Sequence, residues 1–441
     1  MPGKISSYRT GMGGVNLTKG SFHAGDDELV SAQNAEIVED EDIGGDGVLT
    51  KRGGLAVLNT SAMSADVLGI HLFPVLTTYT RTLYAAKGTE DTTTWMTTTN
   101  GTTWTDSTTF LRAADNDKFT DENNSRDARR IATYKQLIIY PGNSYTQDTD
   151  NPDLNFHDGT AGDLVSRINI GPSGNASPPF AITDILAANG KIYFAVHDPG
   201  GTGANIAGRV MQYDPITGKI TQVLNAFGPG TGEVTGGAPS CMAWHQSQLF
   251  VGLNGSATTD AIGKVVRAYP DVDTSWTTDV SNLRSHISSL AEFEGNLYAG
   301  TQSSVSAGAT ITRRLASTAA WVTQVTSASG AGGSGHYASL FVYGGAAYAV
   351  EYFNGTPDVI SILRSTDGTT WNVDRDVDAN DGSADELPGQ MVEYNNDLYV
   401  GFRSLTITGI TGFVMRRSSG TWTKVVTDNL NGQLAVLVVR T

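Results

Sequence analysis

The stretch GNLYAGTQ, residues Gly295–Gln302, is one copy of the pattern that decides the fold. A turn is followed by a short apolar strand that carries an aromatic residue and then small residues. Six further segments have this pattern: RTLYAAKG, KQLIIYPG, GKIYFAVH, SQLFVGLN, GAAYAVEY and NDLYVGFR. The aligned positions, 48 to 57 residues apart, are Tyr84, Ile138, Tyr193, Phe250, Tyr298, Tyr348 and Tyr399. Seven copies at nearly constant spacing indicate a repeat architecture.

A second position repeats in phase with the first. It follows a turn of Gly, Thr, Ser or Asp and precedes a strand of alternating character. Its occupants are Trp104, Leu164, Ile220, Trp276, Trp321, Trp371 and Trp422. Because five of the seven tryptophans share this position, we expect it to pack between neighbouring sheets.

Each repeat also has a strand upstream of the aromatic position, for example DVLGIHLF (66–73) in the first copy and ISSLAEFEG in the fifth. A unit of about four strands in ~50 residues has the size of one propeller blade. The sequence therefore predicts an all-β protein, a seven-bladed β-propeller over residues 61–430. An extended N-terminal arm (1–60) would precede it, and a C-terminal apolar strand (431–441) would follow.

The composition agrees with many short strands joined by tight turns. The 441 residues include 51 Gly and 14 Pro, and only 17% are charged. The single cysteine, Cys241, excludes an internal disulfide and is expected to be a small core residue. A net charge of −16 argues against stable binding of nucleic acid, and no apolar run is long enough to span a membrane.

Two turns of the repeat have their own chemistry. In STDGTTW, Asp367 can accept hydrogen bonds from the amides of its own turn, Gly368 supplies an unusual φ, and Trp371 fills the shared position. TTNGTTW is its counterpart in the first blade, with Asn100, Gly101 and Trp104, and RSSGTW is a shorter one in the seventh. These turns resemble the Asp-box of sialidases and other propellers. We interpret them as structural blade turns.

The resemblance raises the alternative of a sialidase-like glycoside hydrolase. Such an enzyme would need an arginine cluster, a tyrosine nucleophile with a glutamate partner, and an acidic acid/base residue. The arginines are scattered, and no local pattern marks a catalytic set. The seven histidines have no metal-ligand spacing, and no phosphate-binding loop is present. The sequence therefore predicts no catalytic residue, no cofactor and no metal, and a protein that is not an enzyme.

Two acidic loops leave weak calcium binding open. One offers Asp378, Asn380, Asp381, Asp385 and Glu386; the other offers Asp148, Asp150, Asp153 and Asp158. Neither follows the EF-hand pattern, so solvated acidic loops are the interpretation that we favour.

The arm brings a second resemblance. Gly14-Val15-Asn16-Leu17, the acidic segment from Glu28 through SAQNAEIV, and GVLTKRGG (47–54) follow one another. This order resembles the start of tail and neck proteins of tailed bacteriophages, although Gly53 stands where those proteins usually have Pro. The resemblance implies a non-enzymatic structural protein of a phage virion, assembled in the host cytoplasm. Its partners would be other tail or neck proteins and copies of itself, with Lys51 and Arg52 as contacts.

An alternative function is a glycan- or receptor-binding propeller. The loop aromatics available to stack on sugar rings are Tyr145, Phe156, Tyr352 and Phe353. A last open point is the apolar C-terminal strand in GQLAVLVVRT. It must close the ring against the first blade, for example beside GLAVLN (54–59), or add to a sheet of another subunit.

Overall fold

The computed structural model describes about half of the chain, and the account below is restricted to that part. The described residues are 35–38, 48–51, 82–89, 92–107, 132–134, 137–142, 153–157, 166–169, 181–198, 207–226, 237–254, 263–271, 275–284, 286–303, 308–326, 334–354, 359–377, 386–404, 413–427 and 436–440. The chain divides into two compact units, residues 1–79 and 80–441. Among the described residues, no helix is long and apolar enough to cross a membrane.

In the first unit, two strands are described. They are β1 (Ala35–Val38) and β2 (Val48–Lys51), which pair antiparallel. β1 is the end of the SAQNAEIV segment, and Lys51 is the last residue of β2. Arg52 and the rest of the arm lie outside the described residues.

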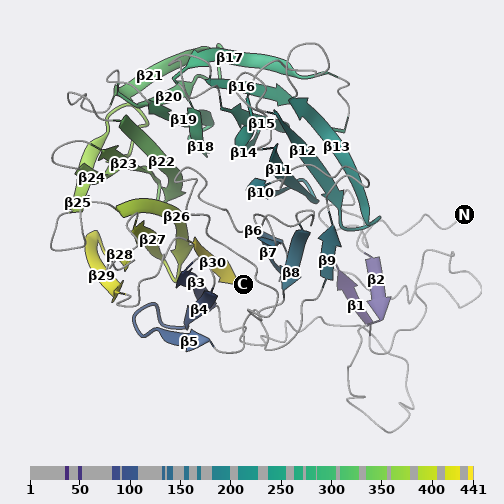
Figure 1. Cartoon of the computed structure of the whole chain (residues 1–441), viewed down its shortest axis with the longest axis horizontal. Helices are drawn as coiled ribbons and strands as arrows, with labels where there is room; N and C mark the ends of the chain where they lie inside the picture. Colours follow the sequence, from purple (N-terminus) through teal and green to yellow (C-terminus); the bar gives the residue numbers. More distant parts are fainter. Residues whose placement is uncertain are drawn as a thin grey trace, which may run out of the picture. The chain divides into compact units, whose positions relative to one another are not determined.

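The second unit confirms the predicted fold. It contains seven four-stranded antiparallel sheets, which we call blades 1 to 7 (Figure 1). Blade 1 consists of β30 (Val436–Arg440), β3 (Thr82–Thr89), β4 (Thr92–Thr98) and β5 (Thr105–Ser107), and blade 2 of β6 (Ala132–Tyr134), β7 (Leu137–Gly142), β8 (Asp153–His157) and β9 (Ser166–Asn169). Blade 3 consists of β10 (Ala181–Ala188), β11 (Lys191–Asp198), β12 (Ala207–Asp214) and β13 (Lys219–Ala226), and blade 4 of β14 (Pro239–His245), β15 (Gln248–Leu253), β16 (Gly263–Ala268) and β17 (Thr277–Leu283).

Blades 5 and 6 are joined into one continuous sheet. Blade 5 consists of β18 (His286–Phe293), β19 (Asn296–Ser303), β20 (Thr310–Arg314) and β21 (Trp321–Thr326), and blade 6 of β22 (Ser334–Tyr343), β23 (Ala346–Asn354), β24 (Val359–Ser365) and β25 (Asn372–Val377). Two residue pairs, Gln302 with His336 and Ser303 with Gly335, link β19 to β22. Blade 7 consists of β26 (Glu386–Tyr394), β27 (Asp397–Ser404), β28 (Phe413–Ser418) and β29 (Thr421–Thr427).

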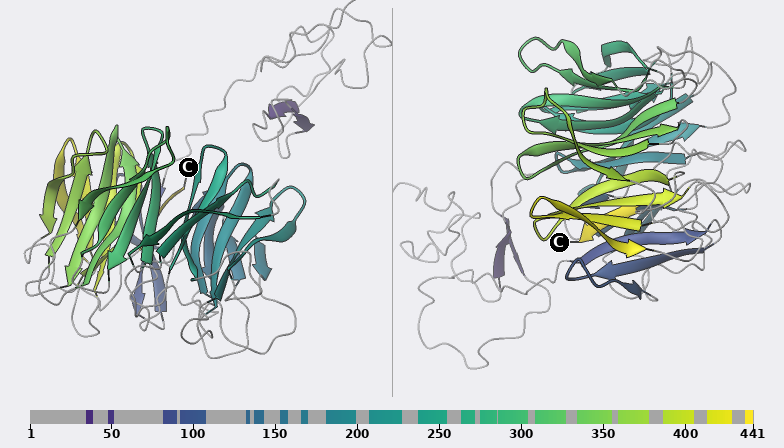
Figure 2. Two further views of the ribbon diagram at one scale, coloured as in Figure 1. Left: turned by 90° about the horizontal axis from the view of Figure 1, so that it is seen from above. Right: turned by 90° about the vertical axis from the view of Figure 1, so that its left-hand side faces the viewer.

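The first strand of each blade lies toward the middle of the ring (Figure 1). The strands run between the two faces of the ring (Figure 2). In every blade the aromatic position of the repeat falls on the second strand. Because successive strands are antiparallel, the hairpins between first and second strands share one face, and the second strands end at the opposite face.

The C-terminal strand closes the ring. β30 pairs with β3, from Thr82 with Arg440 to Ala86 with Val436, so it is the inner strand of blade 1. This settles the choice that the sequence left open in favour of closure within the chain. The segment DVLGIHLF, expected in that place, lies outside the described residues.

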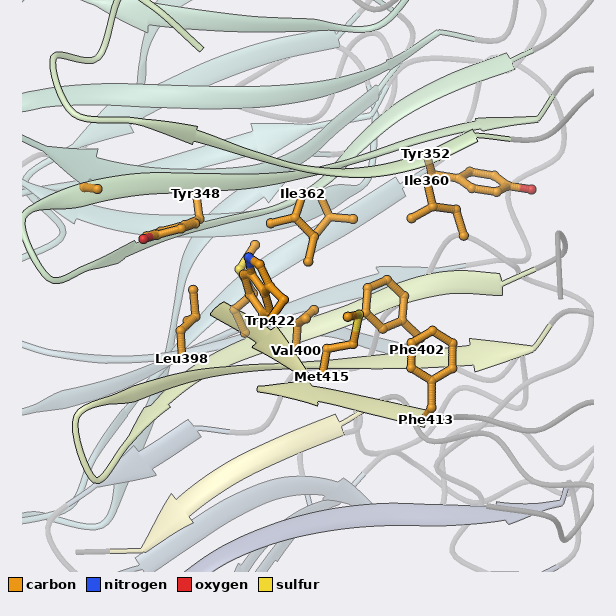
Figure 3. Packing of buried hydrophobic residues seen from close by; sticks show 13 residues of the cluster. Tyr348, Tyr352, Ile360, Ile362, Leu398, Val400, Phe402, Phe413, Met415 and Trp422 are labelled. Carbon is orange, nitrogen blue, oxygen red and sulfur yellow. The ribbon is translucent and has the colours of Figure 1, made fainter. Parts of the chain in front are cut away.

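Neighbouring blades pack through apolar faces. Between blades 6 and 7, Tyr348 and Ile362 of one sheet face Val400, Met415 and Trp422 of the other (Figure 3). The rings of Phe402 and Phe413 stack in the same cluster, 4.7 Å apart. Side chains buried in this way supply most of the free energy that holds blades together.

A repeated bulge ties the inner strands to each other. In blades 3, 4 and 5, one residue of the first strand has no pairing partner, and these residues are Thr183, Ser240 and Ser288. Each hydroxyl donates to a backbone carbonyl of the next blade. Thr183 bonds the Pro239 carbonyl at 2.7 Å, Ser240 bonds that of Ile287 at 2.6 Å, and Ser288 bonds that of Tyr337. The bulges thus turn hydroxyls toward the following blade.

Candidate functional site

The predicted turn at Ser365–Trp371 is a closed hydrogen-bonded loop. The Asp367 carboxylate accepts from the amides of Thr369 (2.8 Å) and Thr370 (2.7 Å), and the Gly368 amide donates to the Ser365 hydroxyl. These amide donors, with that of Thr370 foremost, hold the pKa of Asp367 well below its usual range. The carboxylate is therefore committed to its own turn.

The turn at Thr98–Trp104 has the same geometry with an amide in place of the carboxylate. The Asn100 side-chain oxygen accepts from the amides of Thr102 (2.9 Å) and Thr103 (2.8 Å), and the Gly101 amide donates to the Thr98 hydroxyl. A side-chain oxygen at this point, rather than its charge, is what the turn needs.

Both turn glycines receive a tyrosine from the preceding blade. A Cβ on Gly368 would lie 1.8 Å from the hydroxyl oxygen of Tyr298, and one on Gly101 would lie 1.9 Å from that of Tyr399. Gly101 and Gly368 also have positive φ, 74° and 68°. The two turns therefore join blade 7 to blade 1 and blade 5 to blade 6.

Three tryptophans make a different joint. The indole N–H of Trp321 donates to Asp279 at 2.7 Å and that of Trp422 to Asp374 at 2.6 Å, each carboxylate belonging to the preceding blade. Arg314 and Arg417 pair with the same two carboxylates. Trp276 donates to the Val223 carbonyl at 2.6 Å. All nine predicted turn and tryptophan positions thus lie at contacts between blades, Trp104 and Trp371 through their partly buried rings.

A repeat makes departures from the pattern informative. In five blades the structure describes the inner-strand residue just before the bulge together with its partner on the second strand. These pairs are Ile182–Val196, Pro239–Leu253, Ile287–Thr301, Tyr337–Glu351 and Pro388–Phe402. All point toward the preceding blade, and every pair but one is apolar or has a single hydroxyl. Blade 6 alone has a phenol and a carboxyl there.

The Tyr337–Glu351 pair is the candidate functional site. The Tyr337 hydroxyl donates to Glu351 Oε1 at 3.4 Å. Tyr337 is 1% exposed, whereas Glu351 is only partly buried, near the end of β23. Burial raises the pKa of Glu351 above its ordinary value of 4.5, since the hydrogen bond from Tyr337 only partly offsets the loss of solvation. Burial also raises the pKa of Tyr337.

Blade 5 supplies the other wall of this site. Gly300 lies against Tyr337, because a Cβ there would come within 2.6 Å of both the Tyr337 carbonyl oxygen and the Ser289 hydroxyl oxygen. Ser289 is 1% exposed, and its hydroxyl has no hydrogen-bond partner among the described residues. Gln302 is buried and lies on the same side of β19 as Gly300. A contact that is apolar between other blades thus carries four polar side chains here.

Such a group has defined chemical abilities. A carboxyl of raised pKa can donate a proton or a hydrogen bond when neutral and accept two when ionised. Perturbed carboxyls in clefts are typical of functional sites. Sequence reasoning missed this pair. The available signal was Glu351 three residues after the aromatic position, where other blades have Val196, Leu253 or Phe402, but Lys87 in blade 1 breaks that pattern as well.

Other predicted ligand positions fall elsewhere. Two of the aromatics expected in loops are core residues instead, Phe156 on β8 (4% exposed) and Tyr352 on β23 (2% exposed). Phe353 is also on β23, because the strand runs past the predicted loop start, and Tyr145 lies outside the described residues. This prediction was wrong for Phe156 and Tyr352 because both alternate inward on their strands.

The acidic loops lie largely outside the described part. Asp153 begins β8 and Glu386 begins β26; Asp148, Asp150, Asp158, Asp378, Asn380, Asp381 and Asp385 are not described. Within the described ranges, no group of three or more His, Cys, Asp and Glu side chains is placed to hold a metal ion. Cys241 is a buried free thiol.

Comparisons with known proteins support the fold. Neither the family models nor the curated proteins that were searched match the chain. Among solved structures, a quinoprotein alcohol dehydrogenase-like protein from Bacteroides thetaiotaomicron has a TM-score of 0.50 at 11% identity, over 82% of this chain and 78% of that one. Puromycin hydrolase has a TM-score of 0.51 at 10% identity, over 79% of this chain and 52% of that one. A polysaccharide lyase (an ulvan lyase) has a TM-score of 0.40 at 9% identity, over 55% and 70%. Identities this low show the fold alone.

These comparisons correct one prediction. The expectation that the chain is not an enzyme is contradicted, because the fold that it adopts is that of enzymes such as puromycin hydrolase. The physical reason lies in the repeat. Groups that act together in a propeller come from separate blades, so they leave no compact motif in the sequence, and a missing motif is no argument against catalysis.

Proposed function

We propose that this propeller binds a glycan at the contact between blades 5 and 6, with Glu351 and Tyr337 as its hydrogen-bonding groups. The observation that carries the proposal is that Tyr337–Glu351 occupies a position that is apolar in blades 3, 4 and 7. A carboxyl and a buried hydroxyl, Ser289, offer hydrogen bonds of the kind that sugar hydroxyls make.

The energetics support a role in binding. Burying a carboxyl between two sheets costs free energy unless it is fully paired. The single 3.4 Å bond to Tyr337 pairs Glu351 incompletely. An apolar pair such as Pro388–Phe402 would hold two blades together without that cost. A bound polar ligand would supply the missing hydrogen bonds.

The test is a glycan array probed with the full chain and four variants. Glu351→Gln and Tyr337→Phe should each weaken binding of the recognised glycan about tenfold or more, since hydrogen bonds to charged groups contribute about 1.5–3 kcal/mol. Two matched controls, Glu393→Gln on an exposed site of β26 and Tyr193→Phe, whose hydroxyl has no partner among described residues, should bind normally. Normal binding by Glu351→Gln would contradict the proposal.

A second candidate is hydrolysis of the bound glycan, which the raised pKa of Glu351 favours. Glu351 would act as the general acid that protonates the leaving oxygen. Tyr337 is a poor nucleophile, because it is 1% exposed and burial raises its pKa. Release of reducing ends from the recognised glycan should fall about 10²-fold or more in Glu351→Gln. Binding without any release would restrict the site to recognition.

The role in a phage virion remains a separate proposal. It rests on the arm, including Lys51 and Arg52, whose side chains are not described. Light scattering on the full chain and on one beginning at Leu55 tests it. Assembly that depends on the arm would support the proposal, and two monomers would count against it.

A further inference from the structure

The charge around the Tyr337–Glu351 site is one-sided. Among described residues, the printed contacts of the Glu351 carboxyl are with Tyr337 only, and no lysine or arginine pairs with it. The well-buried arginines near other blades are committed elsewhere: Arg314 to Asp279, and Arg417 to Asp374. The raised pKa of Glu351 agrees with this, since a nearby cation would lower it.

The sequence that adjoins the site adds negative charge. Four segments link the described strands of blades 5 and 6 to each other and to blade 7 at the end where Glu351 lies. They are residues 304–307 (SVSA), 327–333 (SASGAGG), 355–358 (GTPD) and 378–385 (DANDGSAD). None contains Lys, Arg or His, and together they hold four aspartates. The chain as a whole carries a net charge of −16.

An anionic sugar would therefore meet only like charge. A carboxylate or sulfate beside an ionised carboxylate is repelled, and the repulsion grows as water is excluded. Sites for anionic sugars need arginine or lysine donors. Hydroxyl groups need none, and they fit the acceptor and donor set of Glu351, Ser289 and Gln302.

We infer that the site between blades 5 and 6 takes neutral sugars and excludes carboxylated and sulfated ones. This rests on the glycan-binding function proposed above and names the substrate class. It also removes the sialidase-like alternative at this site, because a sialic acid carries a carboxylate.

The experiment compares matched oligosaccharides on the full chain: galactan with polygalacturonate, mannan with mannuronate, and a neutral galactan with its sulfated form. The neutral member of the bound pair should bind at least tenfold more tightly. In Glu351→Gln this ratio should move toward one, because the repelling charge is gone, while Glu393→Gln should keep the wild-type ratio.

The outcomes separate the two proposals. Equal or tighter binding of an acidic member contradicts this inference and leaves glycan binding standing. No binding to any member contradicts glycan binding itself, and the inference with it. If Glu351→Gln does not fold, the wild-type protein still decides, since the ratio for the sulfated pair should fall as pH is lowered and Glu351 is protonated; a constant ratio would overturn the inference.

Discussion

At the scale of residues, two kinds of side chain interrupt the apolar contacts between blades. One kind is fully paired, as Asp279 is with Arg314 and Trp321. The other is incompletely paired, as Glu351 and Ser289 are. The first kind stabilises a joint, whereas the second costs stability and indicates a functional site.

Glu351 should make stability depend on pH. Its pKa is raised in the folded state above the ordinary 4.5, so its contribution is fully present below that value and is lost as pH rises through the folded pKa. Glu351→Gln should therefore melt about 1–3 °C higher than wild type at pH 8 and show no such gain at pH 4. Thermal melts across this range measure it. A difference that does not change with pH would show that the carboxyl costs nothing.

Gly368 should tolerate no side chain. Gly368→Ala combines the strain of a positive φ with a clash against the Tyr298 hydroxyl, and we expect a loss of about 2–4 kcal/mol. Gly344→Ala is the matched control, because its φ is +55° but nothing lies within 4 Å of the added Cβ. Denaturant unfolding compares them. Equal losses in both variants would mean that the tyrosine contact does not matter.

At the scale of elements, the joints alternate around half of the ring. Blades 4 and 6 each offer an aspartate, Asp279 or Asp374, to an arginine and a tryptophan of the next blade. Blades 5 and 7 instead offer a tyrosine, Tyr298 or Tyr399, to a glycine turn. The position opposite the conserved leucine explains the choice, since it is Arg314 or Arg417 in one joint and Ser365 or Thr98 in the other.

Removing one of these aspartates should open a joint. Asp279→Ala leaves Arg314, which is 4% exposed, as a buried unpaired cation, so we expect a loss of about 3–5 kcal/mol. Asp376→Ala, at an exposed position of β25, should cost less than 1 kcal/mol. Urea unfolding of both variants gives the comparison, and a loss under 1 kcal/mol for Asp279→Ala would refute the joint.

The sequence predicted the elements well where the repeat was regular. The spacing of Tyr298 and Trp321 with their counterparts located the second and fourth strands. It could not locate the inner strand of blade 1, because a strand 350 residues distant pairs there as well as a local one would. Nor could it find Glu351, because a single charged residue in a strand is ordinary until the register shows which way it points.

At the scale of the whole molecule, the second unit is a ring closed by its own end. β30 completes blade 1, so one sheet combines the first and last parts of the unit. Closure of this kind protects strand edges that would otherwise pair with another chain.

Deleting residues 431–441 should therefore cost more than eleven residues of surface chain would. β3 would lose its inner partner, and we expect a lower melting temperature and concentration-dependent association. Deleting Thr441 alone leaves the pairing intact and is the control. Light scattering and thermal melts report both effects, and a monomer of wild-type stability would show that the ring does not need β30.

The measurement that tests the central claim most directly is calorimetric titration of the recognised oligosaccharide into the full-length wild type and Glu351→Gln. The account predicts an affinity at least tenfold weaker in the variant, with the Glu393→Gln control unchanged. Equal affinity in wild type and Glu351→Gln would place the binding site elsewhere and contradict the account.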